Sequence, residues 1–332
     1  IFLMIKKGYI TTILLPVAIL VGLALGTFVP GISQSTNPWI EPLVLILLFI
    51  LFFEIRFDPI PAISKNSSFI CLVWVINFLV IPLFAWGIAT LFFKGQPALF
   101  AGLLLYMLFP CTDWFLAFTR IAKGDVALGS VLMPINLISQ LLLFPVYVSF
   151  FIGLQSDFNF SSIWPTFGQW FLVPFISAMV IRYLISRFLS PPRLDFFLKF
   201  SGTAIPWVLA GLVFCIFSAH TSQLLSYPRV FALVLLAVFI FFLFTWFIGE
   251  FLTRRFQLTR PQHVLLAMTT TARNSPLMLG LATIVLPNQP MVYVVLILGM
   301  LVEFPHLTFL TRVFRGRNDR IIASTSEVLP SN

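Results

Sequence analysis

The chain has 332 residues and is strongly apolar: 60% of its residues are hydrophobic, 16% are aromatic and only 9% are charged. Soluble domains carry about 25% charged residues, so this composition excludes a soluble enzyme or binding module and predicts an integral membrane protein. Basic loops that face anionic lipid headgroups explain the net charge of +9, so we expect the lipid bilayer, and no nucleic acid, as a partner.

Apolar segments recur along the whole chain, each close to the roughly 20 residues with which a helix crosses a bilayer. Continuous apolar runs, rather than short alternating segments, favour helices over a transmembrane barrel. We therefore predict an all-α polytopic membrane protein with about ten transmembrane helices. The expected spans are 9–28, 39–57, 68–93, 98–121, 126–152, 163–188, 201–220, 229–252, 262–286 and 289–312.

The positions of Lys and Arg support this count. Seventeen of the twenty basic residues fall in alternate loops on one side of the ten spans, whereas only Lys94 and Arg229 fall on the other side. The remaining one, Arg273, lies inside a span. Because basic loops stay in the cytoplasm, we expect a multi-pass protein of the plasma or inner membrane with both termini cytoplasmic.

Ten spans divide into two sets of five at the basic loop around Ser190. We expect residues 1–190 to form one five-helix repeat and residues 191–332 to form a second, followed by a short cytoplasmic tail. Since five is an odd number, the second repeat would be inserted in the opposite orientation, as in many transporters.

Polar interruptions occur in the fourth span of each half, Pro-Cys-Thr-Asp at 110–113 and Arg-Asn-Ser-Pro at 273–276. Charges and freed backbone groups are costly in hydrocarbon, so such breaks persist only where they line a cavity inside the protein. Breaks at matching positions of two halves indicate the substrate site of a transporter. Ser275 before Pro276 is also typical of a helix start, with Ser275 as the N-cap residue.

The first break carries a lone acid, Asp113, and the second a lone base, Arg273. One interpretation is an ion pair that an anionic substrate opens by competing for Arg273. Another is that Asp113 takes up a proton. The alternative to both is a permanent structural ion pair. A guanidinium at the crossing can itself occupy a cation's place, which argues against sodium coupling.

Four further polar or soft side chains lie inside spans. Cys111 either binds a soft metalloid through its thiolate or is a small buried apolar residue. Glu303 is either a proton-coupling acid or a hydrogen-bond partner of a neighbouring helix. Asn136 and Gln140, one helical turn apart, either line the cavity or form interhelical hydrogen bonds. The three cysteines have no metal-ligand spacing, so we expect no metal site and no cofactor.

Two motifs resemble a known family. The segment 111–125, CTDWFLAFTRIAKGD, is similar to the fourth span of the bile acid:sodium symporter superfamily, especially its arsenite-efflux permease branch. Asn274 and Ser275 with Leu277, followed by GMLVEFP at 299–305, resemble the last part of the arsenite permeases.

This resemblance implies two inverted five-helix repeats, with a panel domain and a core domain whose helices 4 and 9 unwind and cross. It also implies that Cys111 binds a trivalent metalloid and that Glu303 is its acidic partner in the last span. Sodium symporters of the superfamily bind sodium through polar residues of these helices. The corresponding positions here are Phe115, Leu116, Thr269 and Arg273, with Asn274 retained.

We therefore expect a secondary active transporter of a small anion or a metalloid oxyanion such as arsenite, working by alternating access and linked to protons. The alternatives are a sodium-coupled organic-anion symporter and a non-transporting membrane sensor; no motif predicts an enzyme. The sequence leaves the oligomeric state open. The substrate-binding candidates are Cys111, Thr112, Asp113, Arg273, Asn274 and Ser275, the coupling candidates are Asp113 and Glu303, and the cavity candidates are Asn136 and Gln140.

Overall fold

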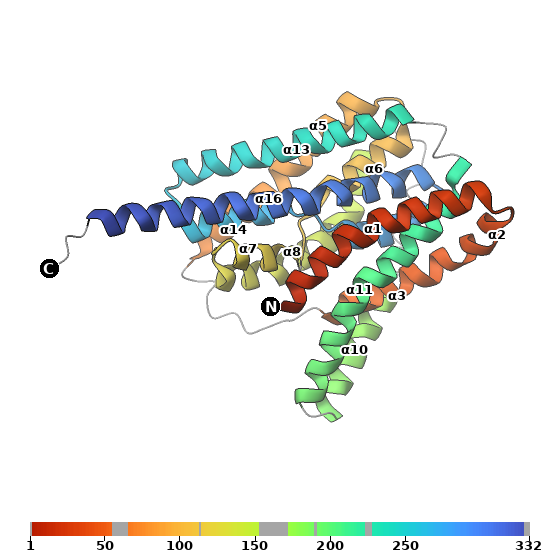
Figure 1. Cartoon of the computed structure of the whole chain (residues 1–332), viewed down its shortest axis with the longest axis horizontal. Coiled ribbons are helices and arrows are strands. Elements are labelled where there is room, and N and C mark those ends of the chain that lie inside the picture. Colours follow the sequence, from red (N-terminus) through yellow and green to blue (C-terminus); the bar gives the residue numbers. More distant parts are fainter. Residues whose placement is uncertain are drawn as a thin grey trace.

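The computed structural model describes residues 2–54, 66–112, 114–152, 172–188, 191–222 and 228–328. These residues are almost entirely helical and contain no β-strand (Figure 1). Six of their helical segments are long and apolar enough to cross a membrane, which confirms the prediction of an all-helical membrane-spanning protein. The six are Ile32–Glu54, Ser67–Phe93, Val126–Phe151, Phe196–Ala219, Arg229–Arg255 and Pro290–Gly316, and three shorter apolar helices are Ile13–Phe28, Pro97–Leu108 and Ser275–Val285.

The described helices include α-helices, a 3₁₀ helix and two π-helical turns. In chain order they are α1 (Phe2–Phe28), α2 (Ile32–Thr36), η1 (Asn37–Trp39), α3 (Ile40–Glu54), α4 (Ser67–Val75), η3 (Ile76–Val80), α5 (Ile81–Phe93), α6 (Pro97–Leu108), α7 (Trp114–Ile121), α8 (Val126–Tyr147), η4 (Val148–Ile152), α10 (Val173–Phe188), α11 (Pro191–Ala219), α13 (Pro228–Arg255), α14 (Arg260–Thr271), α15 (Ser275–Val285) and α16 (Pro290–Val328).

Each expected span overlaps one described helix or two or three consecutive ones, such as α4, η3 and α5 over 68–93. Part of the sixth span, 163–171, lies outside the described residues. The last helix, α16, continues to Val328, beyond the expected end at 312. Both spans with polar interruptions consist of two shorter helices, α6 with α7 and α14 with α15.

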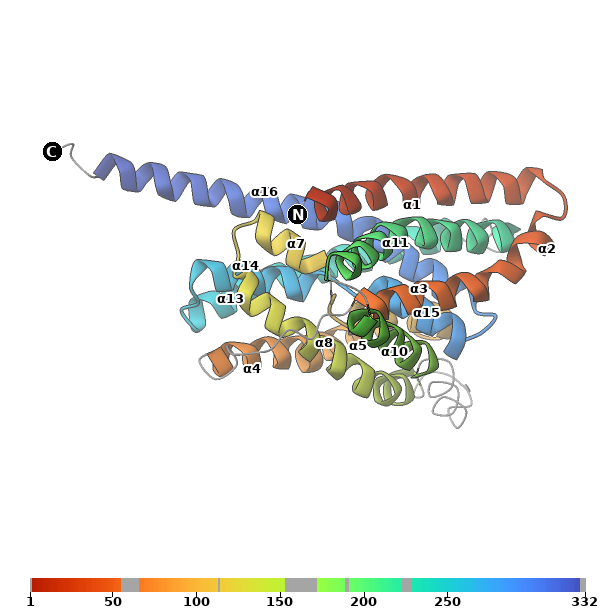
Figure 2. The same ribbon diagram turned by 90° about the horizontal axis from the view of Figure 1, so that it is seen from below.

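The helices form two groups (Figures 1 and 2). In the first group, α11 packs along α1 and α3, and α10 packs on α3. In the second group, α16 packs along α6, α13 and α15, while α5 covers α6 and α14 contacts α13 and α7. The groups meet where α15 packs on α3 and where α16 contacts α1 and α11. The two broken spans therefore lie in the second group, next to the junction with the first.

A proline distorts the third expected span next to the site. Pro82 has no N–H to donate to the carbonyl of Phe78, and its ring crowds that carbonyl. The chain accommodates this with a π-helical turn at Ile76–Val80, and the hydroxyl of Tyr147 on α8 donates to the freed carbonyl of Phe78. π-Helical turns often mark functional sites, and this one carries the buried side chain of Asn77.

Candidate functional site

The two breaks cross in direct contact. The N–H of Cys111 donates to the carbonyl of Ala272 at 2.9 Å, and the N–H of Asn274 donates to the carbonyl of Phe109 at 3.0 Å. Pro110 and Arg273 thereby form an isolated antiparallel bridge. Because no water is present in the bilayer core, these mutual hydrogen bonds satisfy backbone groups that the helices leave free.

Local sequence explains why each helix ends where it does. Phe109 precedes a proline, which disfavours helical backbone, and it is extended with φ −120° and ψ 132°. Ala272 is also extended, with φ −71° and ψ 129°. The second half of that span begins at Ser275, with Asn274 as its N-cap residue. The predicted helix start is thus displaced by one residue, because the Ser275 hydroxyl donates to Glu303 instead.

The side chain of Arg273 is fully buried and binds the ends of two helices. Its Nη2 donates to the carbonyl oxygens of Thr270 at 2.6 Å and Thr269 at 2.9 Å, in the last turn of α14. Its Nη1 donates to the carbonyl of Met107 at 3.2 Å, in the last turn of α6. Nη2 also lies 3.3 Å from the side-chain oxygen of Asn77. The guanidinium therefore lies at two helix C-termini, where the helix dipole favours a positive charge.

Glu303 on α16 places a buried carboxylate against the same crossing; its exposed fraction is 1%. Its Oε1 accepts the N–H of Arg273 at 3.0 Å. Its Oε2 lies 3.4 Å from the hydroxyls of Tyr106 on α6 and of Ser275 on α15. Gly299, one turn earlier on α16, makes room for Tyr106, since a Cβ atom there would lie 2.3 Å from that ring. One acid thus contacts both broken spans.

Amide side chains of α8 support the crossing from one side. The amide nitrogen of Asn274 donates to Gln140 at 3.1 Å and to the hydroxyl of Thr112 at 3.2 Å. Asn136 donates weakly to the hydroxyl of Thr269 at 3.5 Å. Asn136 and Gln140 are both fully buried. Asn136 and Gln140 therefore take part in interhelical hydrogen bonds; that they line a cavity stays a prediction.

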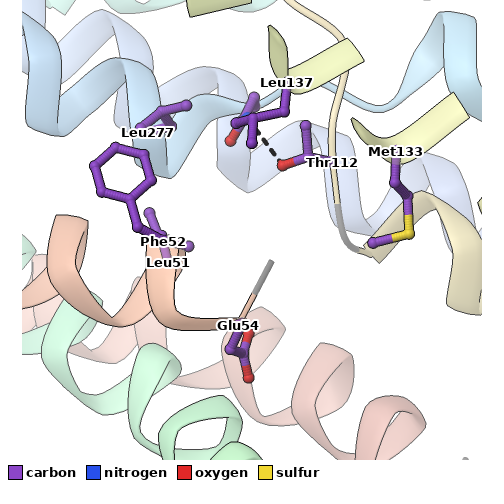
Figure 3. A pocket seen from close by; sticks show the side chains of 8 residues that line it. Leu51, Phe52, Glu54, Thr112, Met133, Leu137 and Leu277 are labelled. Carbon is purple, nitrogen blue, oxygen red and sulfur yellow. Dashed lines mark hydrogen bonds between the residues drawn. The ribbon is translucent and has the colours of Figure 1, made fainter. Parts of the chain in front are cut away.

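A cavity of about 40 Å³ opens beside the crossing, between the two helix groups (Figure 3). This volume has room for only a few water-sized molecules. Figure 3 shows Thr112 across the cavity from Phe52 and Glu54. Polar atoms of both breaks therefore face one small space. The lining residues are Leu51, Phe52 and Glu54 of α3, Thr112, Met133 and Leu137 of α8, Asn274, and Leu277 of α15.

The structure brings most of the predicted site residues together. Thr112 and Asn274 line the cavity, whereas Cys111, Arg273 and Ser275 are buried within the crossing. Asp113 lies outside the described residues, so its pairing with Arg273 stays a prediction.

Sequence reasoning missed several residues of this site. Tyr106 looked like one more aromatic residue of an apolar span, and Thr269 was noted only as a departure from the sodium symporters. Asn77 carried a usable signal, because it is an amide in an apolar span, five residues before Pro82. The apolar residues that line the cavity carried no signal in the sequence that marks them as part of a site.

Curated proteins with similar sequences include one of unassigned role. The chain is 26% identical to the uncharacterized protein YbaS of Bacillus subtilis over 299 residues, which is 88% of this chain and 92% of that protein.

Two arsenical-resistance proteins are also similar. The chain is 25% identical to Acr3 of Corynebacterium glutamicum over 247 residues, covering 69% of this chain and 67% of that protein. It is 24% identical to Acr3 of Alkaliphilus metalliredigens over 238 residues, covering 65% and 66%.

A model of the Sodium Bile acid symporter family matches residues 41–227, more than half of the chain. The match begins at the start of α3 and extends past α11, so it includes the first of the two breaks. With the helical membrane spans and the crossing described above, it shows that this chain belongs to the Sodium Bile acid symporter family of membrane transporters.

Proposed function

We propose that this chain is a secondary active transporter of a small anion or a metalloid oxyanion such as arsenite, working by alternating access and coupled to protons. The observation that carries the proposal is the small cavity at the junction of the two helix groups, into which both breaks direct a polar side chain, Thr112 and Asn274. A space of about 40 Å³ suits a solute of a few heavy atoms better than a sterol. The two Acr3 relatives, whose names refer to arsenical resistance, support the metalloid.

We further propose ten spans in two inverted repeats of five, with both termini cytoplasmic. Because six of the expected spans precede residue 190, the division between the repeats is proposed before the sixth expected span, 163–188, and not at the basic loop around Ser190. The antiparallel bridge that pairs Pro110 with Arg273 has the local two-fold symmetry that inverted repeats require. Pro110 and Arg273 are 163 residues apart in the chain, and so are Gln140 and Glu303. Gln140 and Glu303 each accept a hydrogen bond at the crossing. In Figures 1 and 2 the N-terminal end of α1 and the C-terminal end of α16 point the same way.

Proton coupling is assigned to Glu303, with Asp113 as a second coupling residue. A buried carboxylate in a membrane span is costly unless it is used, so such a residue is a functional candidate. As an ion, Glu303 accepts from Arg273, Ser275 and Tyr106. When protonated, it gains a donor and loses acceptor capacity. Proton uptake would therefore change the contacts between α16 and both broken spans.

The transport assay uses purified protein in proteoliposomes with labelled arsenite and an imposed pH gradient, in choline buffer without sodium. We expect the pH gradient to drive accumulation above empty liposomes and a protonophore to abolish it. Replacing choline by sodium should leave the rate unchanged. Arsenite accumulation that does not depend on the pH gradient would contradict proton coupling. If no gradient drives arsenite transport, a metalloid oxyanion is not the substrate.

A second candidate is a sodium-coupled symporter of an organic anion, which the family match favours. In the same liposomes it predicts no arsenite transport and sodium-dependent uptake of a bile-acid-like anion. The two candidates thus give opposite results when the driving gradient and the labelled solute are exchanged.

A substitution of Cys111 tests separately whether the substrate is a metalloid. Its side chain is fully buried next to Thr112, which lines the cavity. If the thiolate binds the metalloid, Cys111→Ser should lower arsenite transport by at least about tenfold, because oxygen is a poorer ligand for soft ions. Matched controls are Cys71→Ser and Cys215→Ser, at an exposed and a buried free cysteine, which should transport normally. Normal transport by Cys111→Ser would make this thiol a packing residue.

A further inference from the structure

The guanidinium of Arg273 has the surroundings of a bound metal cation. Nη2 has three oxygen neighbours between 2.6 and 3.3 Å, and Nη1 has a fourth at 3.2 Å. Three of the four are backbone carbonyl oxygens, and the other is the side-chain oxygen of Asn77. They come from three separate elements, α14, α6 and the π-helical turn.

Oxygen atoms of this kind are ligands of hard cations, and in transporters the C-terminal ends of half-helices bind sodium. Two such ends, of α6 and α14, converge on Arg273, each with a partial negative charge of about half a unit. The site is sealed from water, so its carbonyl groups would be buried without partners if no cation were present. The ring of Phe241, 5.5 Å from the guanidinium carbon, adds a cation–π contact.

We propose that Arg273 is a tethered cation: its guanidinium fills an oxygen-lined cation site between the C-terminal ends of α6 and α14, and the crossing assembles without a free metal ion. The backbone of Arg273 is held at the centre of the crossing by its bond to Glu303 and by the bridge to Pro110. The positive charge of the side chain therefore occupies the site at any sodium concentration. Removing the guanidinium exposes the site to small monovalent cations.

The test measures thermal unfolding of the purified full-length protein in detergent, in choline chloride and in sodium chloride at equal ionic strength. The natural protein should have the same midpoint in both salts. Arg273→Ala should unfold about 5–10 °C lower in choline, since the buried oxygens lose their partner. Sodium, or a few millimolar methylguanidinium, should restore about half of this loss with saturable dependence on concentration.

The matched control is Arg260→Ala. Arg260 lies at the other end of α14, and its Nη2 donates to the backbone carbonyl of Phe314 at 2.7 Å. This variant should lose stability equally in choline and sodium, because Arg260 lies at the N-terminal end of α14, where the helix dipole does not attract a free cation. Arg273→Gln, which keeps two N–H donors but no charge, serves the same comparison if Arg273→Ala does not fold.

Two results would overturn the proposal. One is a saturable rise of the natural protein's midpoint with sodium, which would mean that a free ion occupies the crossing. The other is an Arg273 variant that folds but recovers nothing from sodium or methylguanidinium. Because the measurement contains no transport substrate, neither result bears on the proposed transport of arsenite, and failure of the transport assay does not affect it.

Discussion

Glu303→Gln is expected to lower proton-driven transport by at least about 100-fold, the scale of losing a proton-transfer group. The carboxylate is buried and is the acceptor through which α16 holds Arg273, Ser275 and Tyr106. Glutamine has nearly the same shape but cannot bind or release a proton. It corresponds to a carboxyl group that is permanently protonated, so the proton-linked part of the cycle should stop.

The same substitution should leave the protein folded. The amide oxygen of Gln can accept the N–H of Arg273, as Oε1 does now. The amide nitrogen would face the hydroxyls of Tyr106 and Ser275, which can turn to accept, because hydroxyl groups both donate and accept. The midpoint of thermal unfolding should therefore change by only a few degrees.

Two transport measurements separate coupling from structure. Accumulation driven by a pH gradient should be lost in Glu303→Gln, whereas exchange of labelled for unlabelled arsenite at equal pH should continue. Glu250→Gln is the control: Glu250 lies on α13, 3.8 Å from His263, and its amide should support normal transport. If Glu303→Gln accumulates arsenite as fast as the natural protein, the coupled proton binds at another residue. If the variant loses both accumulation and exchange and its midpoint of thermal unfolding falls, Glu303 has a structural role.

Hydropathy and proline positions were sufficient to predict much of the fold. Apolar runs of the right length gave the helices, and Pro110 and Pro276 marked the two spans that are broken. The expectation that the breaks occupy matching positions led us to predict that they meet, and the backbone bonds of Cys111 and Asn274 confirm that they do. The extension of α16 to Val328 was missed, because its last part is polar and hydropathy reports only the buried or lipid-facing stretch.

The partners of Arg273 could not be read from the sequence. A lone base suggests a lone acid, and Asp113 was the nearest in the matching break. The described contacts of the guanidinium are mainly backbone carbonyl oxygens, of Met107, Thr269 and Thr270. Every residue has a backbone carbonyl oxygen, so no residue type in the sequence indicates which of them bind Arg273. Which carbonyls are free depends on where two helices end in space.

The cavity wall was hidden for a different reason. Leu137 and Leu142 are both leucines of α8, yet the first is 3% exposed and lines the cavity, while the second is 68% exposed on the outer face. In a membrane protein both environments are apolar, so the usual contrast between buried apolar and exposed polar residues is lost. Only the folded structure distinguishes them, because it places Leu137 on the cavity that residues of α3 and α15 also line.

Substitutions of these two leucines are expected to have very different effects on transport. Leu137→Trp should lower arsenite transport by more than about tenfold, because an indole ring in place of the Leu137 side chain would fill much of a cavity of about 40 Å³. Overpacking a core commonly costs about 1–3 kcal/mol, but here part of the ring enters empty space. The midpoint of thermal unfolding should therefore stay close to that of the natural protein.

Leu142→Trp is the control on the same helix, since a ring there points outward to lipid, and it should transport normally. Transport and thermal unfolding are measured for both variants, with Leu137→Phe as a smaller change if Leu137→Trp unfolds. Normal transport by a folded Leu137→Trp would mean that solutes do not pass this cavity. A block confined to Leu137, with folding retained, would instead place the transport path at the junction between the helix group of α3 and the crossing, because this cavity is the space that both line.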